Sequence, residues 1–478
     1  MDSVARQRLV WGVMAGLTCG SGIQTTANAA GFALIEHGAS GLGTAYAGAA
    51  AISNDSSTIW FNPAGMSELE DREMAFALHA LNTDSTWTDR GTTLGVASGG
   101  ARTSGPVTAE PGGTTALPNF YYAAPISSRW SYGLGIGIPF GSSTEYDRNW
   151  KGRYSTVESS LAVIDINPSV SYRVSDKVRL GFGVSFQQLD VEFGNALDSG
   201  SVCFAAAVDA SFSTDECGSA GLVPGNSAED SYLELTGDST GFGFNLGALF
   251  LPSPDLKIGV AYRHSIEHDV EGDANYILNE SLQTFLEGNS ASAQSQLFTD
   301  NRLANGAISA EVELPATFSL SGAWQYDEKL QLLSDVTWTG WSSVPELRIS
   351  FENPVQNDAV STFDWQDVFR YSVGLTYQFN NQLLLRTGLA FDEEAIPNAQ
   401  LRTPRIPGND RTWFALGANY QVSSQLSFDI GYTRLTVDET PVDNAAPSPD
   451  VEGQGQIVRG VYDTAINILS AQVNWAFN

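Results

Sequence analysis

Apolar and polar residues alternate with a period of two along most of the chain after residue 71. Between residues 369 and 379, every odd position is apolar and every even position is polar or small. The same alternation occurs in residues 178–187, 256–263, 426–433 and 469–477. Successive side chains of a β-strand point to opposite faces, so this pattern predicts strands with one apolar face. A soluble β-sandwich would show the same alternation.

The lengths of the strands and of their connections favour a membrane barrel over a sandwich. Many predicted strands reach about 10 residues or more and carry aromatic residues near their ends, as a transmembrane barrel requires. Tight turns, such as 175–176, 380–381 and 423–424, contrast with long polar connections at 85–117, 195–230, 273–305 and 438–458. We predict an all-β membrane fold, a transmembrane barrel of fourteen antiparallel strands, because a closed even-numbered barrel leaves no unpaired strand edge in lipid. The predicted strands begin near Arg72, Pro118, Trp130, Ser160, Lys177, Ser231, Leu256, Ala307, Lys329, Asp367, Gln382, Arg411, Gln425 and Tyr462.

The first 29 residues have the layout of a cleaved secretory signal peptide. Arg6 and Arg8 precede a short apolar run at residues 9–17, and residues 27–29 (Ala-Asn-Ala) form a small-x-small cleavage site. We therefore expect Ala30 to be the mature N-terminus. The apolar run is too short for the alternative, a single membrane anchor.

Residues 30–71 do not alternate and are rich in Gly and Ala. This segment is too short for an independent domain of ordinary size. We expect it to fold into the barrel lumen as a hatch, with a loose periplasmic tail as the alternative. The predicted organisation is a signal peptide at 1–29, a hatch at 30–71 and the barrel with its long loops at 72–478.

Composition excludes several classes of protein. The 478 residues include 54 acidic and 24 basic side chains, a net charge of −30, which argues against nucleic-acid binding. The mean hydropathy of −0.11 argues against a bundle of membrane helices.

In an exported chain, Cys203 and Cys217 are expected to form a disulfide. We expect the acidic outer loops to share divalent cations with lipopolysaccharide phosphates.

Catalytic and metal motifs are weak. Residues 237–241 match the G-x-S-x-G pattern around Ser239, but they lie in a β-rich segment rather than on a strand–turn–helix elbow. His264 and His268 are four residues apart, a spacing that suits a metal only on a helix. We therefore expect no enzyme activity, no metal site and no cofactor.

Several short motifs together resemble the FadL family of outer-membrane transporters for hydrophobic compounds. The resemblance spans essentially the whole mature chain, with the motifs in the same order as in the family. The matching pieces are 30–32 (AGF), 40–43 (SGLG), 45–46 with Gly48, 62–64 (NPA), 314–315 (LP), 337–342 (TW–WS), 386–392 (RTG with AFD) and 410–413 (DR with W).

The resemblance implies a fourteen-stranded barrel plugged by a hatch. Ligand would enter an outer groove and move to an apolar pocket beside Ala30, Gly31 and Phe32. It would leave sideways where the third strand is kinked. The turn that fixes the hatch corresponds to Asn62, Pro63 and Ala64. The kink corresponds to Gly137, Pro139, Phe140 and Gly141, and Pro139 lacks the N–H that a neighbouring strand would need.

The resemblance implies passive transport of long-chain fatty acids, gated by ligand through hatch rearrangement; uptake of aromatic or alkane hydrocarbons by the same route is the alternative. The family's fatty-acid carriers hold the carboxylate with basic residues just after the fifth strand and before the tenth. The corresponding stretches, 192–195 and 360–363, contain no Arg or Lys, so Arg153 and Arg348 are the substitute candidates.

The expected partners are a hydrophobic small molecule, outer-membrane lipid, lipopolysaccharide and the barrel-insertion machinery. An aromatic residue at the C-terminus is the usual insertion signal, and here Phe477 is followed by Asn478. The sequence contains no sign of oligomerisation, and we expect a monomer in the bacterial outer membrane.

Overall fold

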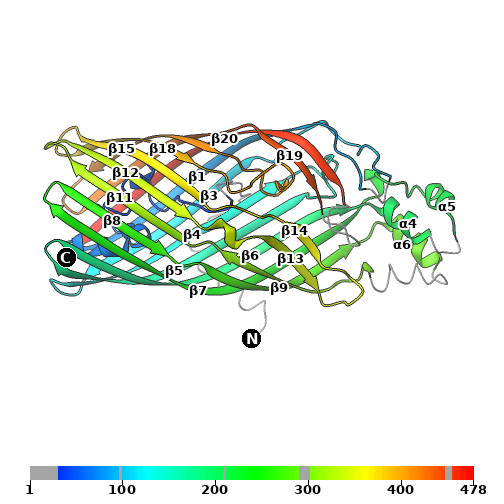
Figure 1. The fold of residues 1–478 in the computed structure, drawn as a ribbon, viewed down its shortest axis with the longest axis horizontal. Helices are drawn as coiled ribbons and strands as arrows, with labels where there is room; N and C mark the ends of the chain where they lie inside the picture. Colours follow the sequence, from blue (N-terminus) through cyan, green and yellow to red (C-terminus); the bar gives the residue numbers. More distant parts are fainter. Residues whose placement is uncertain (1–30, 96–98, 208–211, 290–301, 447–454, 478) are drawn as a thin grey trace.

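A computed structural model describes residues 31–95, 99–207, 212–289, 302–446 and 455–477. The predicted signal peptide and Ala30 lie outside these residues. The described chain forms a long antiparallel barrel with a hatch inside it and three helices at one end (Figure 1). Within these residues, no helix combines the length and the apolar character needed to cross a bilayer.

The barrel wall has fourteen strands, as the alternation predicts. In the described residues one sheet contains twenty β-segments, and six pairs of consecutive segments follow the same line across a short break. The unbroken strands are β1 (Arg72–Asp89), β4 (Trp130–Glu145), β5 (Glu158–Ser175), β6 (Val178–Leu197), β7 (Ser231–Ser253), β16 (Leu383–Asp392), β17 (Arg411–Gln421) and β20 (Ile457–Phe477). The paired segments are β2 (Thr108–Ala109) with β3 (Gly113–Pro125), β8 (Leu256–Arg263) with β9 (Ile266–Ile277), β10 (Gly306–Leu314) with β11 (Thr317–Gln325), β12 (Leu330–Thr339) with β13 (Glu346–Phe351), β14 (Ala359–Thr362) with β15 (Val368–Gln378), and β18 (Leu426–Val437) with β19 (Thr440–Ala445).

The first and last strands close the barrel. β1 pairs with β20 along its whole length, from Arg72 opposite Phe477 to Asp89 opposite Gly460. Tight turns and the C-terminus lie at one end, and the long connections with their helices lie at the other (Figure 1). Short periplasmic turns and long outer loops are typical of outer-membrane barrels, so this asymmetry orients the molecule.

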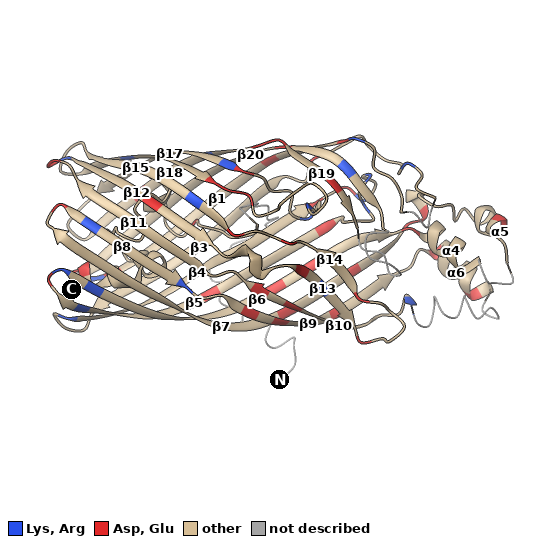
Figure 2. Ribbon diagram, in the orientation of Figure 1, with Lys and Arg blue, Asp and Glu red and all other residues tan. Residues whose placement is uncertain are grey.

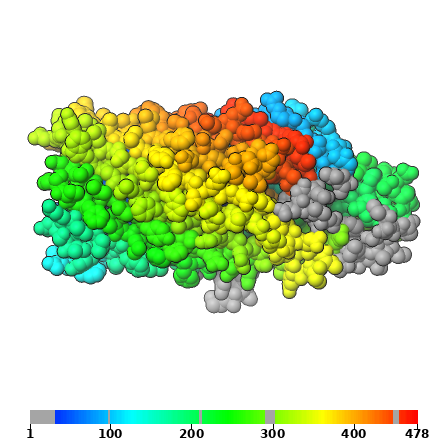
Figure 3. Space-filling view, viewed as in Figure 1, coloured from blue at the N-terminus to red at the C-terminus, as the bar shows by residue number. Residues whose placement is uncertain are grey.

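The two faces of the wall differ as the alternation predicts. In β15, Phe369, Tyr371 and Val373 face outward and are exposed, whereas Arg370 and Ser372 face the lumen and are buried. Seen from the side, the side chains of the wall form a continuous surface (Figure 3). Outward apolar residues follow the strands mainly in the half near the tight turns, so this half provides the lipid-facing band.

The hatch is inside the lumen and contains α2 (Ala39–Leu42), α3 (Thr58–Phe61) and the 3-10 helix η1 (Pro63–Glu68). Glycines of the wall let its backbone approach closely. A Cβ atom at Gly259 would lie 1.9 Å from the carbonyl oxygen of Ala50, and one at Gly388 would lie 2.1 Å from that of Thr44. The inward glycines of the alternating pattern therefore make room for the hatch.

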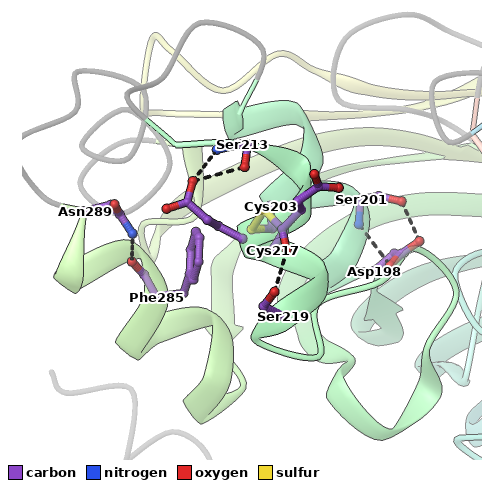
Figure 4. Close-up of a disulfide and its surroundings, with 10 residues drawn as sticks. Asp198, Ser201, Cys203, Ser213, Cys217, Ser219, Phe285 and Asn289 are labelled. Carbon is purple, nitrogen blue, oxygen red and sulfur yellow. Dashed lines mark hydrogen bonds between the residues drawn. A yellow bond between two sulfur atoms is a disulfide. The ribbon is translucent and has the colours of Figure 1, made fainter.

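Helices cover the outer mouth of the barrel. They are α4 (Ser199–Ala207), α5 (Thr214–Ser219) and α6 (Glu280–Gly288), with the 3-10 turns η3 (Ser227–Glu229) and η5 (Trp341–Ser343) elsewhere in the connections. A disulfide joins Cys203 of α4 to Cys217 of α5, and Phe285 of α6 lies beside it (Figure 4). Buried Leu222, Leu282 and Leu286 belong to the same apolar cluster, so the three helices form one small cap.

Carboxylates gather on the outer half of the wall, around β6, β7, β9 and β10 (Figure 2). Asp190, Asp238 and Glu271 are direct cross-strand neighbours on β6, β7 and β9. Like charges opposite each other destabilise a sheet.

Candidate functional site

One cavity lies in the outer half of the barrel, between the wall and the cap. We call it the upper cavity; its volume is about 430 Å³. Strand residues from β6, β7, β9, β10 and β13 line it, and Val202 of α4 closes it on the cap side. Its lining includes Leu189, Leu235, Val270, Val312, Leu347 and Phe363. Such an apolar lining suits a hydrophobic ligand.

A half-buried arginine, Arg405, contributes a positive charge to the upper cavity. It comes from the connection between β16 and β17, and its guanidinium donates to Thr156 Oγ1 and to the carbonyls of Ser155 and Glu158 at 3.0–3.1 Å. The same group lies 4.8 Å above the ring of Phe193. Burial lowers the pKa of Arg405 to about 10. Within the described residues, no carboxylate forms an ion pair with it, so its charge is available to an anionic headgroup.

The hatch N-terminus closes the bottom of the upper cavity with an aromatic cluster. Phe32 lies 5.0 Å from the ring of Trp341, 5.9 Å from Phe140 and 5.8 Å from Trp365. The preceding Gly31 has φ +59°, and a Cβ there would lie 2.5 Å from the Trp341 ring. Only glycine fits this position without strain or displacement of Trp341.

Below this cluster lies a second, smaller space, the lower cavity, with a volume of about 160 Å³. It lies between the hatch and the inner wall. Ala33, Leu34 and Glu36 of the hatch line it, opposite Pro139 of β4 and Arg370 of β15. The Phe32 cluster therefore separates an outer apolar space from an inner, more polar one.

The kink in β4 interrupts the barrel wall beside the lower cavity. Pairing between β3 and β4 stops at Phe120 opposite Ile136, and the β4–β5 register shifts between Gly137 and Phe140. A Cβ at Gly137 would meet Asn119 Oδ1 at 2.5 Å, so the strand also passes close to β3 there.

The hatch pairs with the kinked part of β4. Leu34 N donates to Pro139 O at 2.8 Å, and Gly141 N donates to Phe32 O at 2.9 Å. Ala33 and Phe140 thus form an antiparallel bridge. These contacts make the start of the hatch a short added strand, the latch (residues 32–34), which covers the inside of the break.

Asn62 ties the hatch to the barrel. Its Nδ2 donates to Ala50 O at 2.7 Å and to Ala248 O of β7 at 3.0 Å, and its Oδ1 accepts from Ala64 N at 3.1 Å. Pro63 occupies the first position of η1, where its missing N–H costs no hydrogen bond. The three residues of this motif therefore form one buried turn.

Neither arginine proposed from the sequence lines the upper cavity. Arg153 is fully buried, pairs with Asp230 at 2.6 Å, and donates also to Tyr154 Oη and to the carbonyls of Ser104 and Gly225. Arg348 is exposed and pairs with Glu346 and Asp358. Both guanidinium groups already have protein partners.

The weak catalytic and metal motifs lie on strands of the wall or in a break between two of them. Ser239 is in the middle of β7, and His268 of β9 is buried beside Gln187, with 3.3 Å between Nε2 and Oε1. His264 lies in the break between β8 and β9. Among the described residues, no three metal-ligating side chains are grouped to hold an ion.

The comparisons with known proteins identify the family. Residues 20–477 match the family model described as outer membrane protein transport protein (OMPP1/FadL/TodX). The chain belongs to this family. FadL-family proteins transport hydrophobic compounds through the outer membrane, and this chain is accordingly an outer-membrane transport barrel.

Several relatives are similar to this chain over most of their length. The chain is 29% identical to outer membrane protein P1 of Haemophilus influenzae, over 86% of each chain. It is 26% identical to the long-chain fatty acid transport protein of Escherichia coli K12, over 86% of this chain and 89% of the relative. A Pseudomonas aeruginosa FadL homologue superposes with a TM-score of 0.80 at 25% identity, over 95% of this chain and all of the other. The monoaromatic hydrocarbon channel CymD shares the fold at 17% identity and a TM-score of 0.62.

Sequence reasoning did not find Arg405 or Arg370 as functional candidates. Arg405 lies in a loop without alternation, and Arg370 is one of several polar residues on the inner face of its strand. Arg405 reaches the upper cavity only because the β16–β17 connection folds back into the barrel mouth. No local pattern signals such a path.

Proposed function

We propose that this FadL-family protein takes up long-chain fatty acids across the outer membrane. The observation that carries the proposal is the pairing of an apolar cavity with the half-buried guanidinium of Arg405, which forms no ion pair with a carboxylate of the described residues. A neutral hydrocarbon forms no ion pair with this charge, whereas a carboxylate offsets the cost of its partial desolvation.

The upper cavity then holds the ligand before the hatch moves. Its acyl chain packs against the apolar strand residues, and Phe32 separates it from the lower cavity. Ligand binding shifts the hatch towards a state in which the Phe32 cluster and the latch open. No energy source is required because the ligand moves down its gradient.

Exit through the wall at the β4 kink is the second part of the proposal. The interrupted β3–β4 pairing and the latch that covers it support this route. An acyl chain favours hydrocarbon over water by roughly 0.8 kcal/mol per CH₂. An opening below the lipopolysaccharide layer would deliver it to the bilayer without exposure to water.

The test is uptake of radiolabelled oleate by cells that lack their own long-chain transporter and express this chain, with labelled toluene in parallel. Wild type should restore oleate uptake. Arg405→Met should lower it about tenfold while toluene entry is unchanged, since one charge-assisted contact is worth about 1.4 kcal/mol or more. Arg348 is an exposed arginine, so Arg348→Met is the matched control and should leave uptake unchanged.

Toluene uptake without oleate uptake in equally expressed cells would contradict the proposal and assign the protein to hydrocarbons. Equal loss of both substrates in Arg405→Met would instead show that Arg405 only supports the fold of the barrel mouth.

A further inference from the structure

The lower cavity differs from the upper one in the chemistry of its buried polar groups. Five side chains that line it carry an N–H or O–H group that has no acceptor within the described residues: Tyr46, Asn245, Trp341, Arg370 and Trp413. All five are at least nine-tenths buried. In each case the unpartnered atom can donate a hydrogen bond. The lower cavity therefore offers donors from several elements to a single acceptor-rich group.

Unpaired donors are costly in a folded protein. A buried donor without an acceptor costs about 1–3 kcal/mol, and buried polar groups in native proteins are almost always paired. Their concentration on one small cavity therefore indicates an occupant that accepts hydrogen bonds.

Arg370 is the centre of this donor set. Its Nη2 donates to Ala45 O of the hatch at 2.8 Å, which leaves Nε and Nη1 unpartnered among the described residues. Its Cζ lies 4.9 Å from the ring of Trp413. Ala45 and the adjacent Tyr46 have φ values of +49° and +56°, a backbone region that non-glycine residues adopt only with support. Arg370 thus holds a strained hatch turn and faces the cavity at the same time.

The carboxylates that line the lower cavity are engaged elsewhere or have a raised pKa. Asp335 accepts from Ser321 and Thr337, and Asp392 pairs with Arg411. Burial raises the pKa of Glu36 to about 7, so this hatch carboxyl is largely uncharged below neutral pH.

Of the remaining cations, Arg263 donates to Ser185 Oγ and to Trp60 O, and its Cζ stacks 3.6 Å from the Trp60 ring. Arg411 is the partner of Asp392. Arg370 therefore keeps two nitrogens, Nε and Nη1, that no acceptor among the described residues engages.

We propose that the lower cavity is a second binding site for the carboxylate of the transported ligand, held by Arg370 and Tyr46 after the headgroup has passed Phe32. This inference rests on the proposed function. The carboxylate accepts from Nε and Nη1 of Arg370 and from the Tyr46 hydroxyl. Because Arg370 also holds Ala45, an occupied site changes the contact that fixes the hatch turn. Headgroup binding and hatch movement are thereby coupled through one side chain.

The experiment follows the carboxyl carbon of ¹³C1-labelled oleate by NMR in wild-type protein in lipid nanodiscs. Two bound carboxyl signals are expected, one that disappears in Arg405→Met and one that depends on the lower cavity. Tyr46→Phe removes one hydroxyl and keeps the ring. It should weaken oleate binding at the site of the second signal about fivefold, and Arg370→Met should weaken this binding about tenfold or more. Arg348→Met should change neither signal. Heat-modifiable migration in gels verifies that each variant has a folded barrel.

Labelled oleyl alcohol, which has the same chain and no charge, separates a headgroup site from a structural role. Its binding should be unchanged in Arg370→Met and Tyr46→Phe. An equal loss of oleate and alcohol binding, or a second oleate signal that neither variant alters, would overturn the site. The unpaired donors would then be assigned to bound water.

Labelled acetate distinguishes failure of this site from failure of the proposed function. If wild type binds no oleate but an acetate signal is lost in Arg370→Met, the carboxylate site stands and the fatty-acid proposal fails. If neither oleate nor acetate gives a signal that depends on Arg370, the site is overturned.

Discussion

At the scale of single residues, a few buried side chains determine how the hatch sits in the barrel. Asn62 illustrates this, because one amide group contacts the hatch carbonyl of Ala50, the barrel carbonyl of Ala248 and its own turn at Ala64. The sequence motif predicted a turn at this position. Its contact with β7 depends on a chain separation of 186 residues, which no local pattern contains.

Replacing Asn62 by Ala should loosen the hatch without opening the barrel wall. Three buried backbone groups lose their partner, at about 1 kcal/mol each, so local stability should fall by about 2–3 kcal/mol. Hydrogen exchange measured by mass spectrometry should accelerate at least about tenfold in residues 45–68. Asn82→Ala, an exposed outward-facing residue of β1, is the control, and equal exchange in the two variants would contradict the assignment.

At the scale of elements, alternation located strands in the lipid-facing band better than beyond it. The predicted starts at Arg72, Trp130, Ser231 and Leu256 agree with the structure. The second and last strands begin earlier than predicted, at Thr108 and Ile457, because their outer ends leave the apolar band and lose its signal.

The latch is the element whose movement the proposed exit route requires. Ala33 and Phe140 form a non-hydrogen-bonded antiparallel pair, a geometry with Cα atoms about 4.5 Å apart that a disulfide can bridge. In the double variant Ala33→Cys and Phe140→Cys, oxidation should reduce oleate uptake to about one tenth, and reduction should restore it.

The reduced double variant provides the baseline for that experiment, since it contains the same two substitutions. Wild type treated with the same reductant controls for loss of the Cys203–Cys217 disulfide in the cap. Unchanged uptake in the cross-linked protein would show that the ligand leaves without release of the latch.

At the scale of the whole molecule, charge is distributed unevenly along the barrel. The lipid-facing half presents apolar side chains, and the outer half presents carboxylates such as the row of Asp190, Asp238 and Glu271 (Figure 2). This arrangement exposes like charges on adjacent strands.

Neutralising this row should stabilise the isolated protein. The triple variant Asp190→Asn, Asp238→Asn and Glu271→Gln should raise the free energy of unfolding in detergent by about 1 kcal/mol at low salt, because cross-strand repulsion is removed. The gain should shrink in 1 M salt, where the screening length falls to about 3 Å.

The control for the row neutralises three carboxylates in separate connections: Glu110→Gln, Asp255→Asn and Glu328→Gln. It has the same change in net charge without the cross-strand contacts. An equal gain in both variants would attribute the effect to net charge rather than to the row.

The sequence by itself determined the barrel, its strand number and its family, because period-two alternation is local and each strand must present an apolar face to lipid. It also indicated the kink, since Pro139 removes a ladder hydrogen bond whatever surrounds it. Tertiary structure alone decided which charges line the two cavities. Arg153 and Arg348 are satisfied by nearby carboxylates, whereas Arg405 and Arg370 reach the cavities through loop folding and strand register. Whether a buried charge is free depends on neighbours distant in the chain, and folding alone brings those neighbours together.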